Sequence, residues 1–88
     1  MEKLELVEMM EKIKKDRDEI AFSNIFDFLA QKIKTYFMQN GLSTDISEEL
    51  TQEVMSTIWS KSDKYDTYKS AVSTWVYTIA RNKKVDFL

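Results

Sequence analysis

Aromatic rings, hydroxyl groups and cations gather at the C-terminal end of the chain, in the segment STWVYTIARNKKVDFL at residues 73–88. Proteins hold single-stranded nucleic acid with aromatic side chains that stack on bases and cations that follow phosphates. Hydroxyls and a helix N-terminus add phosphate contacts. In this segment and the loop before it, the candidate nucleic-acid residues are Lys64, Tyr65, Tyr68, Lys69, Ser73, Thr74, Tyr77, Arg81, Asn82 and Lys84. The alternative is an amphipathic helix whose basic side only faces water.

The charge of the chain is divided unevenly along its length. Residues 1–60 contain 7 Lys and Arg against 12 Asp and Glu, whereas residues 61–88 contain 6 against 3. An acidic chain with a basic end is typical of a protein that presents one face to a polyanion. The overall net charge of −2 hides this division.

A second candidate surface lies upstream of the basic end. Apolar residues repeat every four positions over residues 46–58 and predict the buried stripe of a helix. The candidate contact residues away from this stripe are Glu49, Gln52, Glu53, Ser56 and Trp59. Acidic and amide groups at this spacing can meet an arginine-rich helix of a partner, with Trp59 as an anchor at the edge. The alternative is a solvated helix face, with Trp59 at the periphery of the core.

The chain offers little for catalysis or metal binding. It has no cysteine and no histidine, so it lacks the thiolate nucleophile, the usual neutral-pH proton shuttle and two common metal ligands. Two carboxylate pairs, Glu48 with Glu49 and Asp63 with Asp66, have local explanations in the first turn of a helix and in a turn. The sequence contains no glycine-rich phosphate loop. We therefore expect a protein that is not an enzyme and that needs no metal or cofactor.

Apolar periodicity predicts the first two helices. One is expected over residues 2–15, with the stripe Leu4, Val7, Met10 and Ile13. The next is expected over residues 19–39, with the stripe Phe22, Ile25, Phe26, Leu29, Ile33 and Phe37. Asp18 is its predicted cap. Asn40-Gly41 should end it, with one of the two residues in the left-handed conformation.

Two further helices should position the candidate residues. The third is expected over residues 46–61, with Asp45 and Glu48 in a reciprocal cap. The polar run SDKYDTYKS at residues 62–70 predicts a loop. Ser70 or Ser73 is expected to cap the fourth helix. Its predicted buried side consists of Val72, Val76, Ile79, Ala80 and Phe87.

Length and composition restrict the fold. The 88 residues contain one glycine and no proline, which excludes turn-rich all-β designs and predicts one all-α domain, a compact bundle of three to four helices. No apolar run approaches the roughly 20 residues needed to cross a bilayer, and residues 1–10 lack the features of a signal peptide. We therefore expect cytoplasmic residence without membrane insertion. Because no cap follows Leu88, we also expect a fragment of a longer protein.

Two segments together resemble region 2 of bacterial RNA polymerase sigma factors, and the extracytoplasmic-function (ECF) group in particular. They are ELTQEVMSTIW at residues 49–59 and STWVYTIARN at residues 73–82, with Val85-Asp86 after them. Upstream residues that look like the opening helix of that family are Asp18, Ala21, Phe22, Ile25 and Leu29. The resemblance covers residues 18–88 and leaves 1–17 as a separate N-terminal amphipathic helix.

The resemblance implies a role for each segment. The first half of region 2 docks on the clamp helices of the largest polymerase subunit, which would be met here by Glu49, Gln52 and Glu53. The second half recognises the −10 promoter element and holds the opened non-template strand. The loop at residues 64–72 would then cradle a flipped base. Trp75 is the expected core residue of this half.

The sequence departs from the family pattern in several places and leaves a second function class open. Met55 replaces an aromatic residue, and the loop before the last helix lacks the Gly or Arg common there. The alternative function is a helical interaction module that binds an anti-sigma factor or polymerase and has no DNA role. Internal ion pairs of Arg81, Lys83 and Lys84 would favour that alternative.

Overall fold

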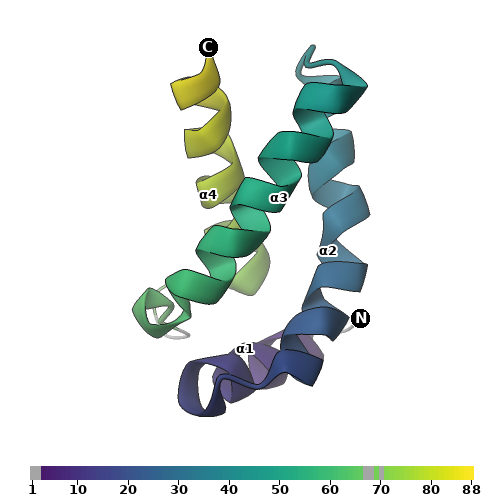
Figure 1. The fold of residues 1–88 in the computed structure, drawn as a ribbon. Helices are drawn as coiled ribbons and strands as arrows, with labels where there is room; N and C mark the ends of the chain where they lie inside the picture. Colours follow the sequence, from purple (N-terminus) through teal and green to yellow (C-terminus); the bar gives the residue numbers. More distant parts are fainter. Residues whose placement is uncertain (1–2, 67–68, 70) are drawn as a thin grey trace.

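The fold is built from helices that pack against one another. The computed structural model describes residues 3–66, 69 and 71–88. In these ranges it contains α1 (Lys3–Asp16), α2 (Glu19–Gln39), α3 (Thr44–Ser60), the short 3-10 helix η1 (Ser62–Lys64) and α4 (Val72–Phe87). The predicted all-α bundle is confirmed. As Figure 1 shows, α2 and α3 form an antiparallel hairpin, α4 lies beside α3, and α1 crosses the lower end of the bundle.

One apolar core joins the four helices. Its buried side chains are Leu6, Met10 and Ile13 of α1; Ala21, Ile25, Leu29, Ile33 and Phe37 of α2; Leu50, Val54, Met55 and Ile58 of α3; Val72, Val76 and Ala80 of α4; and Tyr65. Most of the buried residues of α2 and α3 belong to the stripes that the sequence predicted. Helical spacing puts these residues on the inner face of each element.

Two predicted core positions are wrong. Leu4 is 68% exposed, and Leu6 is buried in its place, because Leu6, Met10 and Ile13 form the i, i+4, i+7 row that faces the bundle. Phe87 is 49% exposed, since it occupies the last residue of α4, two turns beyond the buried Ala80. Ile79 is partly buried against the core, at the edge of the inner face.

The caps of α2 agree with the sequence. Asp18 Oδ1 accepts hydrogen bonds from the backbone N–H groups of Ile20 and Ala21, each at 3.0 Å. Gly41, with φ of 89°, adopts the left-handed conformation just after the helix. The chain then reverses, and the N–H of Leu42 donates to the carbonyl oxygen of Phe37 at 3.2 Å.

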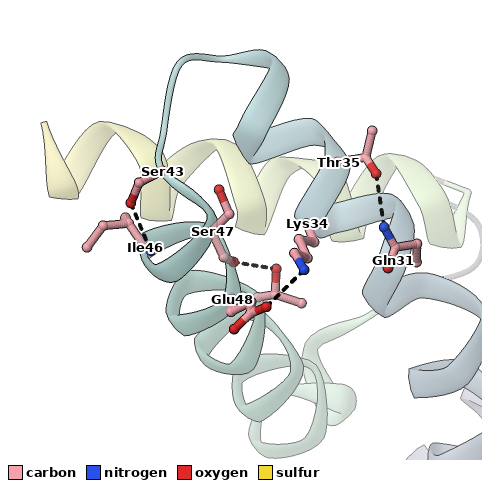
Figure 2. Close-up of polar contacts among 8 residues, drawn as sticks. Gln31, Lys34, Thr35, Ser43, Ile46, Ser47 and Glu48 are labelled. Atoms are coloured by element: carbon pink, nitrogen blue, oxygen red, sulfur yellow. Dashed lines mark hydrogen bonds and ion pairs between the residues drawn. The ribbon is translucent and has the colours of Figure 1, made fainter.

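The predicted starts of α3 and α4 are wrong. Ser43 caps α3, because its extended backbone lets the hydroxyl accept from the N–H of Ile46 at 3.2 Å, so the helix begins two residues earlier than predicted (Figure 2). Ala71 occupies the N-cap position of α4 without a side-chain hydrogen bond, and Ser73 lies inside the helix. Ser70, the other predicted cap, lies outside the described residues.

Polar contacts tie α2 to α3 on one side of the hairpin. Instead of capping α3, Glu48 forms an ion pair with Lys34 of α2 at 2.9 Å (Figure 2). Within α3, Thr51 Oγ1 donates to the carbonyl oxygen of Ser47 at 2.7 Å and so makes no link to α2. Exposed ion pairs contribute little to stability, so the apolar core sets the geometry of the hairpin. Another side of α3, away from these polar contacts, faces solvent.

Candidate functional site

The outward side of α3 carries the first set of candidate residues. Glu49, Gln52, Glu53 and Ser56 are exposed, and Trp59 is half-buried. Gln52, Ser56 and Trp59 line a hollow of about 420 Å³ between α3 and the first turns of α2. The other residues that line it are Glu19, Phe22 and Met55. The structure therefore places part of the predicted contact set around an apolar depression with an acidic and amide rim.

Trp59 is held at the edge of this hollow by two neighbours. The Phe22 ring meets it edge-on, with ring centroids 5.1 Å apart. The guanidinium of Arg17 lies 4.0 Å from the centroid of the Trp59 ring, within the range of a cation–π interaction. Trp59 thus packs at the periphery of the core and also lines the surface hollow, and its role as an anchor for a partner stays a prediction.

Arg17 was not anticipated from the sequence. Its Nη1 donates to the carbonyl oxygen of Trp59 at 2.6 Å and to Ser62 Oγ at 3.0 Å. Its backbone is left-handed, with φ of 53°, which is uncommon for a residue with a side chain. Its position in a polar joint between two helices was the only sequence signal. From that joint it ties the end of α3 to the start of η1.

The predicted nucleic-acid residues fall on two different faces. Ser73, Thr74, Tyr77 and Arg81 line one hollow of about 460 Å³ together with Tyr36 of α2 and Thr78. Lys84 belongs to the same face, because its Nζ lies 5.6 Å from the centroid of the Tyr36 ring. The same Nζ donates to Asn40 Oδ1 at 3.1 Å. We call this surface the α2–α4 face.

Lys64 and Asn82 lie on the opposite side of α4. They line a hollow of about 380 Å³ between α3 and α4, which also includes Lys61, Trp75 and Asp86. A helix turns about 100° per residue, so the neighbours Arg81 and Asn82 line different hollows. Lys69 is exposed in the loop. Tyr68 lies outside the described residues.

Tyr65 is buried, which the sequence did not indicate. It is 1% exposed, and its ring centroid lies 5.3 Å from that of Trp75. Lys14 of α1 donates from Nζ to the carbonyl oxygen of Tyr65 at 2.9 Å. The ring of Tyr65 is not accessible to a base in this conformation. Trp75 is half-buried against it, as expected of a residue that packs on the core.

The cations of α4 differ in whether a carboxylate of the described residues pairs with them. Lys83 lies 3.9 Å from Glu53 of α3 in an exposed ion pair. Within the described part of the chain, Arg81 has no ion pair, and Lys84 contacts a neutral amide and a ring. No carboxylate of the described residues therefore neutralises the charges of Arg81 and Lys84.

The described residues give no other chemical site. They contain no group of three or more Asp and Glu side chains placed to hold a metal ion. Among the described helices, none is both long enough and apolar enough to span a membrane.

Known proteins that resemble the chain point to one family. Sigma-70 region 2 matches residues 28–88. The ECF RNA polymerase sigma factor RpoE of Cereibacter sphaeroides is 40% identical over 82 residues, which are 93% of this chain and 45% of that protein. The ECF RNA polymerase sigma factor SigK of Mycobacterium tuberculosis is 29% identical over 69 residues, or 78% of this chain and 37% of that protein.

A solved structure extends the likeness to the whole chain. Rhodobacter sphaeroides SigE, in complex with the anti-sigma ChrR, matches with a TM-score of 0.93 and 38% identity, over 100% of this chain and 54% of that one. The chain spans about half the length of these relatives, or less. We expected the acidic N-terminal segment to lie outside the resemblance. The structural match includes α1, whereas the match to Sigma-70 region 2 begins at residue 28, so the division at residue 17 stays a prediction.

Proposed function

Because the chain belongs to the sigma-70 region 2 family, we propose that it is a non-enzymatic transcription initiation domain of the ECF group. It docks on the clamp helices of the largest RNA polymerase subunit through α3. It recognises the −10 promoter element and holds the opened non-template strand with α4 and the loop before it. Acting with polymerase, it works in the cytoplasm. The observation that carries this proposal is the placement of exposed Glu49, Gln52 and Glu53 on α3 and of Arg81 and Lys84, without carboxylate partners among the described residues, on α4.

The α3 surface can be tested by binding to a clamp-helix fragment of polymerase. We expect Gln52→Lys to weaken binding at least tenfold, because a cation would face the arginine-rich partner expected there. Gln52 is the sharper position, since Glu53 also pairs with Lys83 at 3.9 Å and its reversal would disturb the link between α3 and α4. Isothermal calorimetry measures the affinity.

Glu8→Lys provides a control for added positive charge, because Glu8 is exposed on α1, away from the α3 hollow. Its affinity should stay within twofold of the original chain. If Gln52→Lys binds as well as this control, the docking assignment to α3 is wrong.

The α4 surface can be tested with a −10 non-template oligonucleotide. Binding should be weak and should fall steeply with salt, since phosphate contacts release counterions. Arg81→Ala should lower the affinity and reduce the slope of log affinity against log salt by about one. Lys12→Ala removes the same charge from an exposed position on α1 and should change the slope less. Salt-independent binding, or a preference for duplex over single strand, would count against the DNA role.

A second candidate function is binding to an anti-sigma factor. It is favoured by the solved relative, which is a sigma factor in complex with the anti-sigma ChrR. The α3 hollow, with Phe22, Met55 and Trp59 in its lining, is an apolar surface that such a protein can cover. Binding to a protein partner without any oligonucleotide binding at low salt would favour this function over promoter recognition.

A further inference from the structure

The α2–α4 face differs in charge from the other hollows of the molecule. Of five well-formed hollows on the described surface, three include a carboxylate, namely Glu19, Asp86 or Glu48. The remaining two lie on the α2–α4 face, where Lys32 and Arg81 are the only charged residues among the described ones in the lining. In a chain with a net charge of −2, this is a local cationic surface without acidic groups. A polyanion fits it better than a basic or neutral protein does.

Two tyrosines join these hollows into one groove. Tyr36 of α2 and Tyr77 of α4 line both of them, and their ring centroids are 5.5 Å apart at an interplanar angle of 74°. Both rings are half-buried, so each is fixed by packing yet still accessible. Lys84 lies above the Tyr36 ring, and Arg81 lies one turn beyond Tyr77. Along α4, residues 73 to 81 span about 12 Å, enough for a short run of nucleotides.

We propose that Tyr36 is a base-stacking residue and that the α2–α4 groove holds unpaired nucleotides of the displaced DNA strand, beyond the flipped base in the loop. This inference rests on the proposed function, and it assigns to α2 a contact that the candidate set had confined to α4 and its loop. The rings of Tyr36 and Tyr77 offer faces and edges to the bases, while Arg81, Lys84 and Lys32 meet the phosphates. Ser73 and Thr74 supply hydroxyl donors at the start of α4.

Tyr36→Leu tests the stacking contact in the 88-residue chain. Fluorescence anisotropy with a −10 non-template oligonucleotide should show affinity reduced by about fivefold or more, the lower end of what one stacked base contributes. Tyr36→Phe keeps the ring and should bind within twofold. Phe28→Leu is the matched control, because Phe28 is also a half-buried aromatic of α2 with a lysine near its ring, Lys32 at 5.2 Å, but lines none of these hollows.

The outcomes separate this inference from the proposed function. If Tyr36→Leu binds like the original chain while Arg81→Ala binds weakly, the DNA role stands and the stacking role of Tyr36 is overturned. If the original chain binds no oligonucleotide, both are overturned. Should Tyr36→Leu lose helical circular dichroism, the ring protons of Tyr36 and Tyr77 can be followed by NMR in the original chain. Upfield shifts on adding oligonucleotide support stacking, and unshifted ring signals overturn it.

Discussion

Among single residues, Arg17 connects parts of the chain that the sequence keeps far apart. Its guanidinium contacts the Trp59 ring, the carbonyl oxygen of Trp59 and Ser62 Oγ, and so bridges 42 to 45 positions of sequence. These contacts fix the ring that lines the α3 hollow and the start of the turn that leads to the loop. Arg17 is a positioning residue, since it acts through Trp59 and not on a partner.

Arg17→Ala should lower the free energy of unfolding by about 2 kcal/mol. It removes hydrogen bonds from a charged donor, one of them to the buried Ser62, and a cation–π contact. Arg17→Lys should recover only part of the loss, because an ammonium has no planar group to lie over the Trp59 ring while its nitrogen donates to the two acceptors. Urea denaturation measures the change, and a red-shifted Trp fluorescence in Arg17→Ala would report a released Trp59. A Lys variant as stable as the original chain would contradict a role for the planar guanidinium.

Gly41→Ala should also destabilise the fold, by about 1 kcal/mol. Gly41 has φ of 89°, and a Cβ added there would meet nothing within 4 Å, so the cost comes from the backbone conformation alone. Gly41→Asn should cost less, because Asn tolerates left-handed geometry better than Ala. Thermal unfolding of the three proteins gives the order. An Ala variant as stable as the original would show that the turn relaxes to another conformation.

Local rules predicted some of these residues and not others. The roles of Asp18 and Gly41 follow from neighbours within a few positions, so the sequence was sufficient to identify both. The contacts of Arg17 and the burial of Tyr65 depend on partners far away in the chain. A tyrosine in a polar run is predicted to be exposed. Only the position of Trp75 in the fold shows that Tyr65 is buried.

Among the helices, α3 shows that the sequence can predict the buried face of a helix correctly and still misplace its first residue. The four-residue apolar repeat correctly identified Leu50, Val54 and Ile58 as buried. The start of the helix was wrong because Ser43 and Asp45 are both acceptable caps, and only the turn after Gly41 decides between them. Two small polar residues, Ser47 and Thr51, are buried as well, since α3 packs closely against α2 at that point.

Ser47→Ala should stabilise the packing of α3 by about 1 kcal/mol. The hydroxyl of Ser47 is fully buried and has no hydrogen-bond partner in the described part of the protein, so it bears the cost of an unsatisfied polar group. Alanine keeps the small volume and has the better helix propensity. Ser43→Ala is an informative comparison on the same helix, because it removes the cap and should lower stability by about 1 kcal/mol. Urea denaturation that shows Ser47→Ala to be the less stable of these two would contradict this account.

For the whole molecule, the sequence predicted a basic end but not the faces that it forms. Helical rotation sends Arg81 and Lys84 toward α2, and Asn82 and Lys83 toward α3. Tyr36, which completes the α2–α4 groove, comes from a helix that carried no predicted contact residue. A surface shared by two helices depends on how they pack, and periodicity within one helix does not reveal it.

Packing also bears on the division of the chain into residues 1–17 and 18–88. From α1, Leu6, Met10 and Ile13 enter the common core, and Lys14 bonds to the backbone at Tyr65. Burying three such side chains contributes roughly 5–9 kcal/mol, which is comparable to the whole stability of a domain this size. We therefore expect residues 18–88 alone to lose cooperative unfolding and much of their helical circular dichroism. Within the intact chain, Met10→Ala should cost about 3 kcal/mol, whereas Leu4→Ser, at an exposed position of the same helix, should cost less than about 0.5 kcal/mol. A truncated chain that unfolds cooperatively with its helices intact would show that α1 is an accessory to an independent three-helix domain.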